Sequence, residues 1–312
     1  MSLAPMAGVN DPAFRLMCRR LGAELSYTEM ISSKGLAYHN KQTQDMLAAF
    51  DGDTPFAVQL FGNEPDVMAT QARLLEQRLG SDLALIDLNM GCPARKVVAG
   101  GNGAALMRNP ELAYKIIVAV VKSVHVPVTV KIRKSSDSGA HRTLDFARMA
   151  EDAGVAALCV HGRSAEQHYQ EQADKQLVCE LAQALVVPVI ATGDVMDAYD
   201  VRDYLRCGVS GVMIARGALG NPWIFRQAQA LLAGDEQAAT VTPSVAEIVR
   251  LASDHIRMLY AHDPKKLVWM RRHLAWYLKG MPHAATLRRR LQSCVSLDDY
   301  LSLLAGLDKG EL

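Results

Sequence analysis

The chain has 312 residues, of which 50% are apolar and 21% are charged, and its formal net charge is +1. This composition is that of a globular protein and excludes long disordered, collagen-like and low-complexity chains. The chain has no uninterrupted apolar run of about 18 residues, which excludes a membrane-spanning helix, and residues 1–5 lack the features of a signal peptide, so we expect a cytoplasmic protein.

Roughly the first 220 residues alternate short apolar runs with stretches long enough to form a helix. Most of the runs are continuously apolar, as is typical of strands that are buried on both faces. Asp11-Pro12 and Asn109-Pro110 each place a capping side chain before a proline that suits the first turn of a helix. The eight predicted strands are Leu3–Met6, Leu25–Thr28, Phe56–Phe61, Ala84–Leu88, Pro127–Ile132, Ala156–Val160, Pro188–Ala191 and Gly211–Ala215.

Eight strand–helix units in about 220 residues predict an α/β fold, namely a (β/α)8 TIM barrel, in a catalytic domain that spans residues 1–235. The alternative is a doubly wound open sheet. Such a sheet usually has fewer strands and a G-x-G-x-x-G turn after the first one, and residues 4–8 do not form that motif.

A linker is predicted at residues 233–242, and the capping-box pattern of Ser244 and Glu247 then opens a small all-helical domain at 243–312. This domain holds 11 Lys and Arg against 7 Asp and Glu, whereas the rest of the chain has a net charge of −3. Eight basic residues and no acidic residue lie within 265–290. The uneven charge predicts an anionic partner for the helical domain.

Polar and ionisable residues follow the predicted strands at their C-terminal ends, where barrels of this type carry their chemistry. Gly193 and the pair Arg216-Gly217 follow the seventh and eighth strands, which is where barrels commonly bind a phosphate. Lys131 could place a cation beside the electron-rich end of a reduced ring. Together these residues predict a phosphorylated planar cofactor across the barrel mouth.

The six cysteines are scattered without a C-x-x-C pair, so we expect them to be reduced and not to form disulfides. Cys92 is either a small buried residue or a functional thiol, and the other five are expected to be packing or surface residues. No spacing of His, Cys, Asp or Glu indicates a metal site.

Six sequence blocks together resemble the signatures of the tRNA-dihydrouridine synthases, most of all the bacterial B type. The resemblance covers nearly the whole chain and includes residues 271–277 of the helical domain. The Asn-Met-Gly-Cys-Pro block is specific in its place after the fourth strand. The blocks are residues 3–8 (LAPMAG), 58–62 (VQLFG), 87–93 (DLNMGCP), 130–133 (VKIR), 160–163 (VHGR) and 221–225 (NPWIF).

The resemblance implies an FMN-dependent enzyme that reduces the C5–C6 double bond of specific uridines in tRNA with NADPH, and we expect a monomer. Cys92 would be the catalytic proton donor. The cofactor would be bound by Pro5, Met6, Ala7, Gln59, Lys131, His161, Thr192, Gly193, Asp194, Ala215 and Arg216. The RNA substrate would be bound by Asn89, Arg133, Arg163, Arg271, Arg272 and Lys279.

This assignment fits the chemistry. Hydride delivery to C6 leaves carbanion character at C5, and an ordinary thiol is mostly protonated at neutral pH and can supply the proton. The target base must leave its stack in the folded RNA to reach the barrel mouth. Arg272, Trp276 and Lys279 share one face of a predicted helix that could contact RNA, and Trp276 is expected first of all in the core of the helical domain.

Two alternative functions remain open. One is a flavin barrel that acts on a free pyrimidine, like the dihydroorotate dehydrogenases, and the other is a redox-inactive RNA-binding protein.

Overall fold

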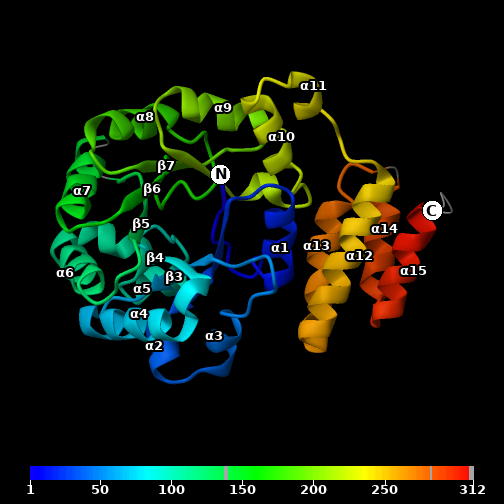
Figure 1. The fold of residues 1–312 in the computed structure, drawn as a ribbon, viewed down its shortest axis with the longest axis horizontal. Helices are drawn as coiled ribbons and strands as arrows, with labels where there is room; N and C mark the ends of the chain where they lie inside the picture. The colour runs from blue at the N-terminus through cyan, green and yellow to red at the C-terminus, as the bar shows by residue number, and fades with distance from the viewer. Residues whose placement is uncertain (137–139, 282, 309–312) are drawn as a thin grey trace.

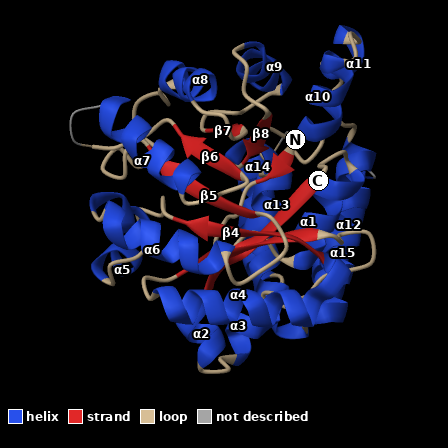
Figure 2. Ribbon diagram, turned by 60° about the vertical axis from the view of Figure 1, so that its left-hand side comes forward, coloured by secondary structure: helices blue, strands red, loops and turns tan. Residues whose placement is uncertain are grey.

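The computed structural model describes residues 1–136, 140–281 and 283–308. Its eight parallel strands pair in chain order, and β1 also pairs with β8, so the sheet closes into a barrel with the helices outside it (Figure 2). The prediction of a TIM barrel is confirmed. The strands are β1 (Ser2–Leu3), β2 (Leu25–Ser32), β3 (Phe56–Phe61), β4 (Leu83–Asn89), β5 (Val128–Arg133), β6 (Ala157–His161), β7 (Val189–Thr192) and β8 (Gly211–Ile214).

All eight predicted strands are present, with differences at the first two. β1 ends at Leu3 instead of Met6, because the chain turns into a loop after Ala4, whose amide still donates to the Ile214 carbonyl at 2.8 Å. β2 continues to Ser32, and its register with β3 shifts between Tyr27 and Met30. The strands are mostly apolar and buried, as expected for a sheet covered on both faces, with a few buried polar residues such as Gln59 and Asp87.

Helices cover the outside of the barrel. Asp11 and Asn109 accept hydrogen bonds from the first-turn amides of α1 and α6, which confirms both predicted helix starts. The barrel helices are α1 (Pro12–Arg20), α2 (Ser33–Ala37), α3 (Lys41–Asp45), α4 (Pro65–Leu79), α5 (Arg95–Ala99), α6 (Pro110–Val121), α7 (Ala140–Asp152), α8 (Lys175–Ala184), α9 (Ala198–Arg206) and α10 (Ile224–Leu232). Short 3-10 helices are η1 (Gly80–Asp82), η2 (Gly103–Arg108) and η3 (Arg216–Ala218).

The C-terminal part is helical, as predicted, and lies beside α1 of the barrel (Figure 1). A short helix, α11 (Glu236–Ala239), interrupts the predicted linker, and the capping box of Ser244 and Glu247 opens α12. The remaining elements are α12 (Val245–His262), η4 (Pro264–Trp269), α13 (Met270–Tyr277), α14 (Ala284–Ser293) and α15 (Leu297–Asp308). Residues 309–312 of the predicted helical domain lie outside the described residues. None of the described helices is long and apolar enough to span a membrane.

A buried polar cluster joins α1 of the barrel to the C-terminal helices. The Asp11 carboxylate lies 3.3 Å from Nε2 of His255 on α12 and 3.2 Å from Nε2 of His273 on α13. These donor atoms are close enough together to hold a metal ion, but the hydrogen bonds among them and with the α1 amides already occupy the carboxylate. The cluster therefore adds paired polar groups to the apolar contacts that link the two parts of the chain.

The prediction that all six cysteines are reduced is wrong for two of them. Cys179 on α8 and Cys207 at the end of α9 form a disulfide, with their Cα atoms 5.5 Å apart. Their separation of 28 residues matches no short motif, and only the packing of adjacent barrel helices brings them together. Cys18, Cys159 and Cys294 are free and buried, as predicted for packing residues.

Candidate active site

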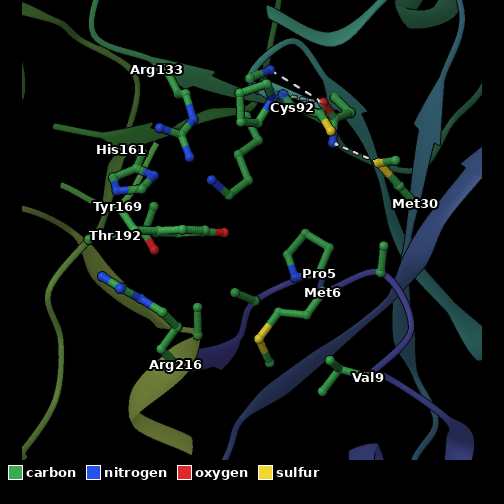
Figure 3. Close-up of a pocket in the computed structure, with 18 of the residues that line it drawn as sticks. Pro5, Met6, Val9, Met30, Cys92, Arg133, His161, Tyr169, Thr192 and Arg216 are labelled. Atoms are coloured by element: carbon green, nitrogen blue, oxygen red, sulfur yellow. Dashed lines mark hydrogen bonds between the residues drawn. The ribbon is translucent and has the colours of Figure 1, made fainter. Parts of the chain in front are cut away.

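A cavity of about 420 Å³ opens at the C-terminal ends of the strands, which is within the size range of small-molecule sites. Arg133, His161, Tyr169 and Arg216 form one wall, which faces Pro5 and Met6 across the cavity (Figure 3). All eleven residues predicted to bind the cofactor line it, and so do Cys92, Asn89 and Arg133. These residues come from seven of the eight strands or the loops after them, and Met30 lines the cavity from β2, because a parallel barrel directs every C-terminal strand end to the same mouth.

The loop after β4 holds Cys92 at the edge of this cavity. The Asn89 side-chain oxygen accepts hydrogen bonds from the amides of Cys92, at 2.9 Å, and Gly91, at 3.3 Å. The Cys92 carbonyl accepts from the amide of Ala104 at 3.0 Å. Cys92 is half-buried and free. Its thiol is therefore attached to a backbone that is fixed at both the amide and the carbonyl.

A chain of hydrogen bonds fixes Asn89 from inside the barrel. The Gln59 side chain accepts from Asn89 Nδ2 at 2.8 Å and donates to Asp87 at 2.6 Å, and Thr129 donates to the other Asp87 oxygen at 2.6 Å. Burial raises the pKa of Asp87 to about 6, while the hydrogen bonds from Gln59 and Thr129 oppose that rise. Asp87 was missed as a functional candidate, although a lone carboxylate inside an apolar strand is a signal that could have found it.

The wall around His161 is cationic. Burial lowers the pKa of Lys131, and the neighbouring Arg133 adds to that effect. Burial also lowers the pKa of His161 to about 2, helped by the charges of Lys131, Arg133 and the two nearby arginines. His161 is therefore neutral at physiological pH, and the cations beside it favour an anionic ligand. Tyr169, which sequence reasoning missed, lies between the guanidinium groups of Arg133 and Arg216, at 5.9 and 4.4 Å from its ring centroid.

Asp194 organises the side of the cavity at the end of β7. Its carboxylate accepts from Arg163 at 2.6 Å, from Arg216 at 2.9 Å and from the Ala173 amide at 2.8 Å. Arg163 is only 2% exposed and does not line the cavity, so it lies behind the site, and its predicted contact with RNA stays a prediction. Gly193 has a φ of +113°, and a Cβ at this residue would lie 2.7 Å from the His161 ring. Only glycine lets the backbone approach the ring this closely.

Three basic residues of the helical domain were predicted to bind RNA, and the structure places them in different surroundings. Arg271 donates to the Tyr300 hydroxyl at 3.3 Å and the Cys294 carbonyl at 3.0 Å, so it is engaged within that domain. Arg272 is exposed and lies against Gly8 in the loop after β1. Lys279 is exposed but follows the end of α13, so it does not continue the predicted helix face. Trp276 packs against the barrel core, contrary to the prediction that it belongs to the helical core.

Comparisons with known proteins show which family the chain resembles. The sequence profile of the dihydrouridine synthase family matches residues 2–308. The chain is 39% identical to tRNA-dihydrouridine synthase B of Xanthomonas axonopodis pv. citri, over 96% of this chain and 90% of that protein. It is 37% identical to tRNA-dihydrouridine synthase B of Pseudomonas putida, over 93% and 86% of the two chains.

A crystal structure of a mandelate oxidase variant is similar to 77% of this chain and 73% of its own, with a TM-score of 0.50 and 19% identity. That likeness concerns the barrel fold alone. The family profile and the relatives' identity extend over both the barrel and the helical part. Five of the six residue blocks that resembled this family in the sequence meet around one cavity, and the sixth, residues 221–225, does not line it. The chain therefore belongs to the dihydrouridine synthase family.

Proposed function

We propose that this protein reduces the C5–C6 double bond of uridine in tRNA, with FMN as cofactor, NADPH as reductant and Cys92 as proton donor to C5. The observation that carries the proposal is Cys92 itself, held by Asn89 at the edge of a cavity that also has a cationic wall. The names of the relatives, tRNA-dihydrouridine synthase B, support the choice of RNA as substrate. The monomeric state stays a prediction.

The cavity suits a phosphorylated planar cofactor. Arg216 and the backbone around Gly193 and Gly217 would hold the phosphate, and a Cβ at Gly217 would lie 2.3 Å from the Val195 carbonyl oxygen, so no side chain fits there. Pro5, Met6 and Gln59 would contact the ring system from the other side. Bound there, FMN would supply the hydride for C6 of the uracil.

The chain's own groups would bind the base and supply the proton. Arg133 and Asn89 would orient the uracil beside Cys92, whose Sγ would give its proton to C5 as the C5–C6 double bond is lost. Neutral His161 can offer one ring N–H without adding charge. Exposed Arg272 and Lys279 would contact phosphates while the target base is out of its stack.

The visible absorption spectrum of the purified protein, recorded without oxygen before and after NADPH is added, tests the cofactor. We expect a yellow flavin band that bleaches with NADPH and returns when tRNA lacking dihydrouridine is added. Mapping dihydrouridine in that tRNA tests the substrate. A colourless protein that takes up no added FMN would contradict the cofactor proposal. A flavoprotein that is oxidised by a free pyrimidine and not by tRNA would contradict the substrate proposal.

Replacing Asn89 with Ala is expected to slow dihydrouridine formation by about 100-fold, because the Cys92 loop loses the acceptor that holds two of its amides. Flavin content should change little. Single-turnover rates at saturating tRNA measure the effect. Asn63→Ala is the matched control, since Asn63 contacts the same segment only through the Gly100 carbonyl. Equal rates for the two variants would remove Asn89 from the positioning of Cys92.

A further inference from the structure

A second cavity, of about 220 Å³, lies between the barrel and the C-terminal helices. Asn10 and Glu29 contribute to it from the barrel, Gln42 from α3, and Lys266 and Trp269 from η4. None of these residues belongs to the set that lines the first cavity. The second cavity is therefore a distinct site that the chemistry described above does not use.

Asn10, which lines this cavity, carries an unpaired acceptor. Its side chain is 2% exposed, and its amide nitrogen donates to the Ala4 carbonyl at 2.7 Å and to the Tyr27 carbonyl at 2.8 Å. These two bonds fix which end of the amide is the oxygen. Within the described part of the chain, that oxygen has no hydrogen-bond partner. A buried acceptor without a partner is costly, and a ligand that brings an N–H donor would remove the cost.

Glu29 is a second acceptor. It is 7% exposed, and one of its oxygens accepts a hydrogen bond from the Gly8 amide. A carboxylate has about four lone-pair sites on two oxygens, so acceptor capacity remains for a ligand. Burial is the largest influence on Glu29 and raises its pKa above the usual value of a glutamate. Hydrogen bonds from a ligand's donors would replace those that burial has removed between this carboxylate and water.

The remaining wall carries an aromatic ring and charges of both signs, with Lys265, Lys266 and Trp269 beside the carboxylates of Asp11, Asp45 and Asp263. The Lys266 ammonium lies 5.4 Å from the centroid of the Trp269 ring, and Lys265 is exposed beside it. An indole ring offers a face for a nucleobase, and the two lysines offer charge for its phosphates.

The two cavities are separated by a thin layer of backbone. Met30 lines the first cavity and its neighbour Glu29 lines the second. Likewise, Val9 lines the first cavity and its neighbour Asn10 lines the second. The loop after β1 and the end of β2 thus form a shared wall. A single RNA strand that crosses this wall could place one base in each cavity.

We propose that the second cavity binds a guanine of the substrate tRNA, other than the reacting uridine, with its Watson–Crick edge against Glu29 and Asn10. Among the four bases, guanine is the one that presents adjacent N1–H and N2–H₂ donors, which match the two oxygens of a carboxylate. Trp269 would stack on the base, and Lys265 and Lys266 would contact its phosphates. This inference rests on the proposed function, because its ligand is part of the tRNA.

The test uses the flavin-loaded full-length protein and tRNA transcripts in which inosine replaces guanosine at random positions, with a cleavable phosphorothioate at each inosine. Inosine lacks only the N2 amino group. Bound and unbound transcripts are separated and cleaved, so positions where inosine weakens binding are read directly. The proteins compared are the wild type, Glu29→Gln and Glu111→Gln, the last being the same change at an exposed residue on α6.

At one guanosine, we expect inosine to weaken the binding of the tRNA to the wild type about tenfold. The same inosine should have almost no effect on binding to Glu29→Gln. Glu111→Gln should match the wild type. Identical interference maps for wild type and Glu29→Gln, or no interference at any guanosine, would overturn the inference and leave the proposed function intact. If the wild type does not bind tRNA, the result would contradict both the proposed function and this inference.

Discussion

Replacing Cys92 with Ala is expected to reduce dihydrouridine formation by a factor of about 100 to 10,000, the usual contribution of a positioned general acid. The thiol is the group that the β4 loop holds at the cavity edge, and alanine leaves the amide and carbonyl contacts of that loop unchanged. Hydride transfer would then lack a matched proton donor at C5. Single-turnover formation of dihydrouridine in tRNA measures the loss.

Cys92→Ala should keep the wild-type flavin content, the bleaching by NADPH and the affinity for tRNA, since none of these needs the thiol. Cys294→Ala is the matched control, because Cys294 is a free thiol in the C-terminal helices. A Cys92→Ala enzyme that turns over at the wild-type rate would show that another group donates the proton.

Replacing Asp11 with Ala is expected to lower the free energy of unfolding by about 3–5 kcal/mol, which is typical when one partner of a buried charged pair is removed. The carboxylate caps α1 through the amides of Ala13 and Phe14, both at 2.9 Å, and it contacts His255 and His273. The variant leaves two buried histidines and two helix amides without their acceptor. Urea unfolding at pH 7, followed by far-UV circular dichroism, measures the change.

The same carboxylate predicts a pH dependence of stability. Burial favours the neutral form of Asp11, but the charge of His255 and the hydrogen bonds from both histidines outweigh burial and hold its pKa well below 3.8. Because the folded pKa is lower than the unfolded one, the stabilisation is present above pH 4 and is lost as the pH falls below that value. The wild type and Asp11→Ala should therefore differ less in stability near pH 3 than at pH 7. Asp66→Ala, at an exposed residue on α4, should change stability by less than about 0.5 kcal/mol at either pH.

The barrel and the residues of its mouth could be predicted from the amino-acid sequence because both depend on local order along the chain. A strand that is buried on both faces is mostly apolar, so runs such as Phe56–Phe61, in which Gln59 is the one polar residue, could be recognised. In a closed parallel barrel, the residue after each run comes to the same mouth, so Lys131 and His161 could be placed together without any coordinates.

Other features depend on distances between residues that are far apart in the chain. The contact of Asp11 with His255 spans 244 residues, and the disulfide of Cys179 with Cys207 depends on how α8 packs beside α9. The ion pair of Arg163 with Asp194 likewise joins residues that are 31 positions apart in the chain. Hydrogen bonds and ion pairs act over a few ångströms in space, and no pattern along the chain reports such a distance until the fold brings the partners together.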